Sequence, residues 1–267
     1  MSLIRWVRWI FTGALTLFAP TSQAAVSPTD VETVAARRIV FGHQSVGDNL
    51  LDGIADIAGS KIPIAKTADR SAVDRPGIVH SYVGENEKPM TKIAGFEKWI
   101  DSAGPKIDIA FFKFCYIDFD AAIDVDALFK EYETAMARLR QKHPQIAFIH
   151  VTTPLTTTQT GWKRWLRRLL GKSVWGEREN TTRHRLNELM RNAYAPEFIF
   201  DLAKFESTGP DGQAIAFELE GARIPALDKS YTDDGSHLNV DGRKRMAEQL
   251  LQFLARVPLQ PAESSRP

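Results

Sequence analysis

Hydrophobic side chains along the chain alternate between short continuous runs and longer stretches with helical spacing. Continuous runs are typical of buried strands, and a recurrence every three or four residues is typical of amphipathic helices. Residues 45–59 show the second pattern, with Val46, Leu50, Ile54 and Ile57 on one face. The pattern predicts strands at 37–42, 61–67, 106–117, 145–153 and 197–202, and helices at 45–59, 90–101, 124–143, 177–195 and 239–257.

The predicted elements follow one another as strand and helix throughout. Such alternation is typical of parallel strands joined by right-handed crossovers, with helices on both faces of the sheet. We therefore expect an α/β fold, a three-layer α/β/α sandwich of flavodoxin-like type with about five parallel strands. Ligands of such sheets bind beyond the carboxyl ends of the strands. The loops of interest are 42–47, 67–90, 115–124, 152–176 and 202–237.

The first 24 residues have the composition of a secretory signal peptide. Arg5 and Arg8 precede an apolar stretch, 9–18. Ser22-Gln23-Ala24 then forms a small-x-small cleavage pattern. An uncleaved membrane anchor is the alternative, but the apolar stretch is short for a span, which needs roughly 20 residues. We expect an exported protein, periplasmic or secreted. Its parts would be a signal peptide at 1–24, a single domain at 25–257 and a disordered tail at 258–267.

The net charge argues against nucleic acid as a partner. The chain carries +1, and the predicted signal peptide holds two arginines and no acidic residue, so the remaining chain carries about −1. A general electrostatic grip on nucleic acid needs clustered positive charge. The single cysteine, Cys115, allows no internal disulfide, and a domain of this size can fold without one.

A serine stands where the first predicted strand passes into the first helix, in Phe41-Gly42-His43-Gln44-Ser45. Unpaired backbone N–H groups and the positive end of the helix dipole surround this position. An acyl-transfer nucleophile would find stabilisation for an oxyanion there. Serine is also a favoured helix N-cap, so this segment alone leaves both interpretations open.

A second unusual segment, 231–246, precedes the last predicted helix. In it, Asp234 and His237 are three residues apart. A carboxylate at this spacing in a turn can hydrogen-bond the imidazole, set its tautomer and support the imidazolium formed during proton transfer. The predicted topology lets this loop fold back over the end of the first strand, beside Ser45. Helix capping by Asp234 and an exposed loop position for His237 are the alternatives.

The two segments together resemble the SGNH/GDSL hydrolase superfamily, through topology and motif order over roughly residues 37 to 255. The late Asp234-Gly235-Ser236-His237 matches the superfamily's Asp-x-x-His, whereas His43-Gln44-Ser45 replaces its early Gly-Asp-Ser. The resemblance implies Ser45 as nucleophile, His237 as general base and Asp234 as the orienting carboxylate. Asp233 fits the last role less well because its spacing is wrong.

The resemblance also implies an oxyanion hole made by the serine N–H, a glycine and an asparagine. Gly84 matches the glycine, and Asn86 lies close to it in the sequence. Ile117 stands where the asparagine is expected and has no side-chain donor. Loss of one donor costs on the order of 2.7–4 kcal/mol in the barrier. Either Asn86 or Tyr116 replaces it, or the chain is a weak catalyst or a non-catalytic relative.

The residues give weaker support to a metal site and to a cysteine nucleophile. Imidazole and carboxylate suit zinc, but His43, His80, His237 and Asp234 show no short metal-ligand spacing. We expect His43 to bond a backbone group or to line the pocket. Cys115 ends an apolar run, where a buried thiol is usually inert. The resemblance implies that no cofactor or metal is needed.

A basic and aromatic stretch, 161–175, follows the fourth predicted strand. It is interpreted either as an arm over the site that contacts polysaccharide or a membrane surface, or as a solvated helix whose apolar side chains pack inward. That inward set would be Trp162, Trp165, Leu166 and Leu169. Arg178, Asn180 and Arg183 follow directly and would be placed to bind an anionic group of a substrate.

The favoured hypothesis is an exported serine esterase that acts through an acyl-enzyme. An O-acylated carbohydrate or another small ester is the expected substrate, as the superfamily resemblance and the export signal imply. O-acetyl transfer is the variant of the same chemistry. A non-catalytic polysaccharide-binding relative and a membrane-surface lipase or lysophospholipase are the alternatives. The sequence does not specify the acyl donor, the acceptor or the oligomeric state.

Overall fold

The computed structural model describes residues 25–67, 73–103, 106–159 and 161–259. The predicted signal peptide at 1–24 and most of the predicted tail, 260–267, lie outside the described residues. Within the described part, none of the helices combines the length and the apolar character that crossing a bilayer requires.

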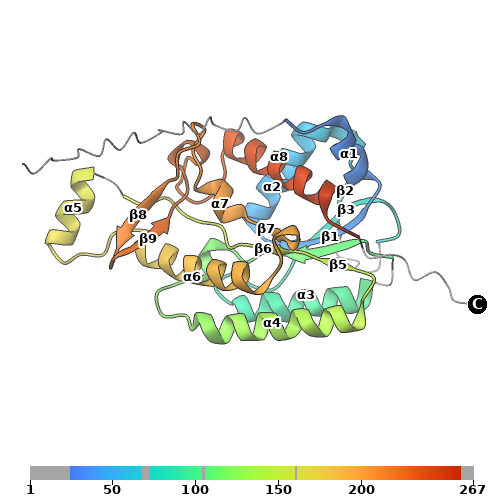
Figure 1. Ribbon diagram of the computed structural model, residues 1–267, viewed down its shortest axis with the longest axis horizontal. Helices are drawn as coiled ribbons and strands as arrows, with labels where there is room; N and C mark the ends of the chain where they lie inside the picture. Colours follow the sequence, from blue (N-terminus) through green and yellow to red (C-terminus); the bar gives the residue numbers. More distant parts are fainter. Residues whose placement is uncertain (1–24, 68–72, 104–105, 160, 260–267) are drawn as a thin grey trace, which may run out of the picture.

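A five-stranded sheet forms the centre of the molecule, and each strand is parallel to its neighbours (Figure 1). A further parallel pair, β6 and β7, follows β5, and Ile149 between β5 and β6 donates a hydrogen bond to Ala110 of β4. In spatial order the strands of the main sheet are β2 (Ile64–Lys66), β3 (Gly77–Tyr82), β1 (Arg38–His43), β4 (Ile109–Phe112) and β5 (Ala147–Phe148). The pair consists of β6 (His150–Val151) and β7 (Ile199–Phe200).

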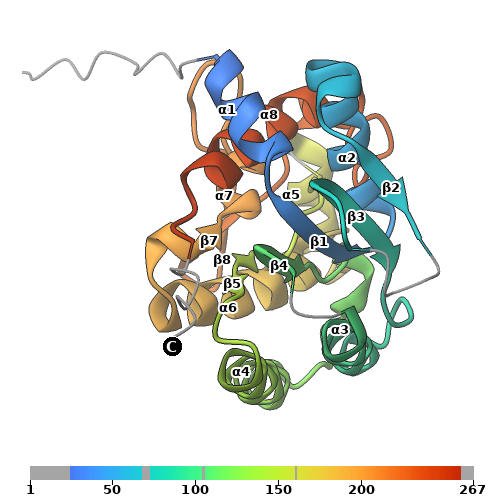
Figure 2. The same ribbon diagram turned by 90° about the vertical axis from the view of Figure 1, so that its right-hand side faces the viewer.

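Helices cover both faces of this sheet, as Figure 2 shows, and the predicted three-layer α/β/α class is confirmed. One face packs against α1 (Pro28–Ala35), α2 (Ser45–Ala58), α7 (Leu202–Glu206) and α8 (Val240–Arg256). The other face packs against α3 (Pro89–Ala103), α4 (Val125–Lys142) and α6 (Glu177–Ala193).

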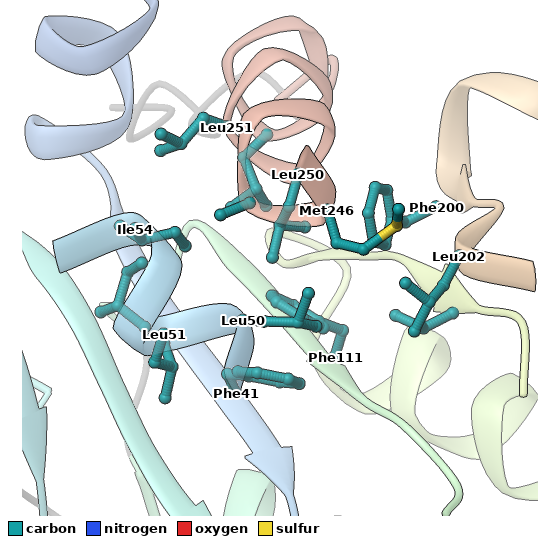
Figure 3. Close-up of a cluster of buried hydrophobic side chains, with 14 of the residues drawn as sticks. Phe41, Leu50, Leu51, Ile54, Phe111, Phe200, Leu202, Met246, Leu250 and Leu251 are labelled. Atoms are coloured by element: carbon teal, nitrogen blue, oxygen red, sulfur yellow. The ribbon is translucent and has the colours of Figure 1, made fainter. Parts of the chain in front are cut away.

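The layer between α2, α8 and the sheet positions the functional site. Phe41 of β1 and Leu50 of α2 are almost completely buried there, with Met246 of α8 beside them (Figure 3). Since β1 is covered on both faces, its sequence is continuously apolar rather than alternating. Asp124 caps α4 with its side chain, as the sequence predicts.

The structure differs from the predicted elements at two places before the middle of the chain. The stretch 61–67 contains only the short edge strand β2, and the strand beside β1 is β3, which lies within the predicted loop 67–90. The polar His80 and Ser81 interrupt the apolar run of β3, so its hydrophobic signal is weak. The predicted strand 106–117 is also shorter, because only 109–112 pair with neighbours.

The sequence pattern predicts neither α1 nor several elements of the later loops, whereas it leaves a helix within 161–175 open. Those elements include the antiparallel hairpin of β8 (Ala216–Leu219) and β9 (Ala222–Pro225), which is outside the main sheet. The helix α5 (Gly161–Leu169) lies at the edge of the molecule next to this hairpin (Figure 1).

Candidate active site

Ser45 is the first residue of α2, directly beyond the carboxyl end of β1. Gln44 occupies the N-cap position in an extended conformation, but its side chain does not cap the helix. Instead, the Gln44 amide donates to the backbone carbonyls of Val83 (3.3 Å) and Gly84 (3.1 Å), in the loop after β3. This contact ties the serine junction to the neighbouring strand end and leaves the first backbone N–H groups of α2 available for a ligand.

The loop before α8 brings a histidine and a carboxylate to this serine. The Oγ atom of Ser45 is 3.1 Å from Nε2 of His237, although the two residues are 192 positions apart in the chain. The opposite ring nitrogen, Nδ1, is 2.7 Å from Oδ2 of Asp234. The other oxygen, Oδ1, accepts hydrogen bonds from the backbone N–H groups of Ser236 and His237, both at 2.8 Å. The structure therefore joins the three residues in one hydrogen-bonded chain.

Asp233, the weaker candidate for the carboxylate, points elsewhere. Its Oδ1 is 3.3 Å from the side-chain amide nitrogen of Asn239, the residue that caps α8.

Electrostatics keep the Asp234 carboxyl ionised. Partial burial alone would raise its pKa, but the hydrogen bonds from the His237 ring and from the His237 and Ser236 backbone lower that pKa to about 2. An ionised Asp234 accepts a hydrogen bond from the N–H group at Nδ1 of His237. The lone pair of a neutral ring is therefore on Nε2 and faces Ser45. This is the tautomer that a general base for the serine needs.

Asn49 holds the histidine loop on α2, and sequence reasoning missed it. The Asn49 side-chain oxygen accepts the backbone N–H of Leu238 at 3.2 Å. Asn49 lies one turn after Ser45, so both side chains are on the same face of α2. The spacing of one helical turn from Ser45 is the sequence signal that could have identified Asn49.

Tyr116 also reaches the histidine. Its hydroxyl is 3.3 Å from Nε2 of His237, and its ring meets the imidazole edge-on with centroids 5.4 Å apart. Burial raises the pKa of the Tyr116 phenol, so the hydroxyl keeps its proton at neutral pH. Tyr116 thus places an O–H group beside the proposed base and nucleophile.

Arg183 holds the backbone of Tyr116 in place through hydrogen bonds. Its guanidinium donates twice to the backbone carbonyl of Tyr116, at 2.8 and 3.0 Å, and also to Thr156 and Asn180. Both Arg183 and Asn180 are buried. The expectation that Asn180 binds an anionic substrate group is wrong, because this side chain is fully buried and bonded within the protein. Arg183 is bonded within the protein as well but lines the pocket described below, so its part in binding an anionic group stays a prediction.

The other two oxyanion candidates lie in the loop after β3. Gly84 has a φ of 61°, and a Cβ there would come within 2.5 Å of the Lys92 backbone nitrogen, so only glycine fits this approach to α3. The side-chain oxygen of Asn86 accepts a hydrogen bond from Nζ of Lys92 at 3.1 Å. Across the described residues, no hydrogen bond joins Asn86 to Ser45 or His237.

His43 lies beneath the serine junction, fully buried, and is separate from the chain of Ser45, His237 and Asp234. Its Nδ1 bonds the Gln44 carbonyl at 2.9 Å, and its Nε2 is 2.8 Å from Nδ1 of His80. Burial lowers the pKa of both histidines, that of His43 to about 3, so both rings are neutral at neutral pH. His43, Asp48 and His80 form the one group in the described ranges whose ligand atoms lie close enough to hold a metal ion.

Cys115 is buried at the end of the same strand region as Tyr116. Its sulfur is 3.7 Å from Nζ of the buried Lys113. The thiol is therefore buried beside a lysine, and no hydrogen bond joins it to Ser45 or His237 in the described ranges.

A pocket of about 280 Å³ is lined by Tyr116 and Ser236, whereas Ser45, His237 and Asp234 are not among its lining residues. Apolar surface comes from Ile117 and Trp175, and acidic groups from Glu87, Asp120 and Glu179. The remaining lining residues are Phe119, Thr156, Gly176 and Arg183. Because Tyr116 and Ser236 contact the catalytic candidates directly, a group bound in this pocket would lie beside them.

Comparison with known proteins supports the fold. No protein-family model and no curated protein matches the sequence. A structure from Streptococcus pneumonia named for platelet activating factor has a TM-score of 0.50 and 16% identity, covering 85% of this chain and 89% of that chain.

Two further solved structures are more distant. One, from Desulfitobacterium hafniense DCB-2 and named for the lipolytic G-D-S-L family, has a TM-score of 0.46 and 12% identity over 81% of this chain and 99% of that chain. The other, a carbohydrate esterase of family 3 from Talaromyces cellulolyticus, has a TM-score of 0.44 and 13% identity over 82% and 98%. At these identities the likeness concerns the fold and not the activity.

Proposed function

We propose that the protein is a serine-dependent acyl hydrolase or acyltransferase that forms an acyl-enzyme on Ser45. The hydrogen-bonded chain from Ser45 through His237 to Asp234 is the observation that carries this proposal. It supplies a nucleophile, a base in the required tautomer and an ionised orienting group from side chains alone.

The reaction starts with transfer of the Ser45 hydroxyl proton to Nε2 of His237. The Oγ atom then forms a bond to the acyl carbon, and the carbonyl π electrons move to its oxygen. When this tetrahedral intermediate collapses, the bond to the alcohol oxygen breaks and His237 returns its proton to that oxygen. Water, or a hydroxyl of an acceptor, attacks the acyl-enzyme by the same steps in reverse and restores Ser45.

The oxyanion would be stabilised from two directions. The backbone N–H of Ser45 lies at the N-terminus of α2, where the helix dipole favours negative charge. The Tyr116 hydroxyl is the second donor, in place of the side-chain amide that Ile117 cannot supply. Tyr116 currently approaches Nε2 of His237, and it becomes free to turn once that nitrogen holds a proton.

The proposed substrate is an O-acylated carbohydrate or another small ester. The pocket beside Tyr116 is near the lower limit of ligand sites, which span roughly 300–1,000 Å³. It suits a short acyl group or a single sugar ring better than a long acyl chain. Export, proposed from the composition of residues 1–24, would place the enzyme among envelope or extracellular esters.

The first test is hydrolysis of p-nitrophenyl acetate by the wild-type chain, Ser45→Ala and His237→Ala. We expect turnover by the wild type and background rates for both variants, because either change removes a group that makes or breaks bonds. Ser60→Ala, an exposed serine just past the end of α2, is the matched control and should retain full activity. Unchanged turnover in Ser45→Ala would exclude Ser45 as the nucleophile.

A fluorophosphonate label covers the case in which the pocket rejects that ester. It reacts with an activated serine whatever acyl group the pocket prefers. Labelling of the wild type and not of Ser45→Ala supports the proposal. Absence of both labelling and turnover would instead favour a non-catalytic polysaccharide-binding protein, the alternative to which the missing donor at Ile117 points.

A membrane-surface lipase is the third candidate, and the exposed apolar side chains of α5 favour it. Rates on p-nitrophenyl esters of increasing chain length separate it from a short-chain esterase. A preference for acetyl and propionyl esters supports the small-ester proposal, whereas rising rates with longer chains would favour the lipase.

A further inference from the structure

The helix α5 turns its apolar face toward solvent. Trp162, Trp165 and Leu169 are 69%, 65% and 66% exposed, and Leu166 and Leu170 are also exposed. At about 100° per residue, the side chains at 162, 165, 166 and 169 fall within one narrow stripe of the helix. The alternative that these side chains pack inward is therefore wrong.

The opposite face of α5 holds the helix on the protein through charge. Arg164 and Arg168 both pair with the buried carboxylate of Glu177, at 2.5 and 3.1 Å. Both also donate to the backbone carbonyl of Glu218 in β8, at 2.8 and 3.0 Å. A helix at the surface of a water-soluble domain normally has the reverse orientation, with its apolar stripe inward. The two arginines thus fix α5 with its tryptophans and leucines outward.

The charged residues of the stretch that contains α5 are of one sign. The stretch 161–175 contains five lysines and arginines and no acidic residue. Arg164 and Arg168 share the single carboxylate of Glu177, which offsets one of their two charges, whereas Arg167 and Lys172 are exposed. Tryptophan rings prefer the boundary between headgroups and acyl chains, and basic side chains beside them attract anionic phosphate.

We propose that α5 is a docking helix for an anionic lipid surface. The exposed basic groups complement anionic headgroups. The exposed leucines beside the tryptophans favour lipid over a glycan chain, because leucine side chains bury well among acyl chains and offer no ring for a sugar to stack on. The helix would lie in the plane of the headgroups, with Trp162, Trp165 and Leu169 inserted. This inference is independent of the proposed esterase activity.

Docking through α5 would also place the proposed active site close to the lipid surface. Trp175 follows α5 shortly in the chain and lines the pocket beside Tyr116 and Ser236. Its ring lies against Gly235, between Asp234 and Ser236, where a Cβ would come within 2.9 Å of it. A substrate at or near the membrane would then meet the pocket without the protein leaving the surface.

The test uses a local probe, because the apolar residues 9–18 near the start of the chain could themselves bind lipid. An environment-sensitive fluorophore is attached at Leu166→Cys. The native Cys115, which is buried, is replaced by serine so that the label has a single site. The matched control is Val240→Cys, at an exposed apolar position on α8. We expect a blue shift at 166 and none at 240 when vesicles of phosphatidylglycerol and phosphatidylcholine are added, and a weaker shift with phosphatidylcholine alone.

Two variants confirm which groups bind. In the labelled chain, Trp162→Ser with Trp165→Ser should abolish the shift, and Arg167→Glu with Lys172→Glu should abolish its dependence on anionic lipid. The urea midpoint and the far-UV circular dichroism spectrum should be the same in all of them, which shows that the fold is intact without reference to the proposed activity. No shift at 166 with anionic vesicles would overturn the proposal. Concentration-dependent self-association through the tryptophans, or pelleting with insoluble polysaccharide without a lipid shift, would overturn it in favour of those partners.

Discussion

At the scale of single residues, two hydroxyl groups lie within hydrogen-bond distance of the same ring nitrogen of His237. Ser45 and Tyr116 both approach Nε2 of His237, at 3.1 and 3.3 Å. A neutral ring has one lone pair there, so the two hydroxyls compete for it before the reaction. After the serine proton has moved to Nε2, the Tyr116 hydroxyl has no acceptor on the ring and can turn to a developing oxyanion.

Tyr116→Phe tests this role. Because the ring and the backbone contact to Arg183 remain, we expect normal folding and a KM close to that of the wild type. The loss of one oxyanion donor should lower kcat on the order of 10²-fold. Tyr194→Phe is the matched control, since Tyr194 stacks on His150 and contacts none of Ser45, His237 and Asp234 in the described part of the chain. A Tyr116→Phe enzyme with unchanged kcat would exclude the hydroxyl from the reaction.

At the scale of elements, a buried ion pair connects three segments around the site. Nζ of Lys92 in α3 is 2.5 Å from a carboxylate oxygen of Asp118, and neither side chain is exposed. The same carboxylate accepts the backbone N–H groups of Cys115 (2.7 Å) and Glu87 (3.0 Å). Asp118 thereby fixes the loop after β3 and the short 3₁₀ turn Tyr116–Asp118 relative to α3.

Lys92→Met should destabilise the protein by roughly 3–5 kcal/mol, because it leaves the Asp118 charge buried and unpaired. Urea denaturation measures the difference. Adding Asp118→Asn should recover part of the loss, since the amide carries no charge and its oxygen can still accept one of the two backbone bonds, which now end on different oxygens. Lys88→Met is the control: its pair with Glu85 is largely exposed, so its loss should change the free energy of unfolding little. Equal effects of the two lysine variants would contradict this account.

At the scale of the whole molecule, buried titratable groups make stability depend on pH in opposite directions. Burial lowers the pKa of His150 to about 3, so the folded protein keeps this ring neutral. The unfolded chain binds a proton below about 6.5, and stability is therefore lost as the pH falls from there toward 3. Burial raises the pKa of Glu206 to about 8 from an ordinary 4.5, so this carboxyl is neutral in the fold. Its contribution is lost as the pH rises through that interval.

Glu206→Gln separates the two effects. The amide oxygen can still accept the Leu155 N–H, which now bonds Oε2 at 2.7 Å, and it never ionises. The free energy of unfolding should rise relative to wild type by on the order of 2 kcal/mol more at a pH of about 8 than at about 5. Urea midpoints at the two pH values measure this. A variant that gains equally at both would show that Glu206 is not the neutral acid inferred here.

Local patterns in the sequence determined the layers of the fold and part of the site. The alternation of apolar runs and helical stripes predicted the parallel sheet between two helix layers, because burial on both faces leaves that pattern in each strand. The spacing of Asp234 and His237 predicted their contact, since a turn of three residues brings such side chains together. Ser45 was recognisable from its position between a strand and a helix. The strand β3 escaped detection because polar residues interrupt it.

Contacts between distant segments were decided only by the tertiary structure. Packing of α8 on α2 brings His237 to Ser45, and the spacing of two residues 192 positions apart carries no information about that distance. The place of Tyr116 depends on Arg183, which the sequence suggested as a ligand-binding group. The stripe on α5 was visible in the sequence, but its outward direction was not. Helical periodicity shows which side chains share a face, whereas the partners of Arg164 and Arg168 decide which face is turned to the solvent.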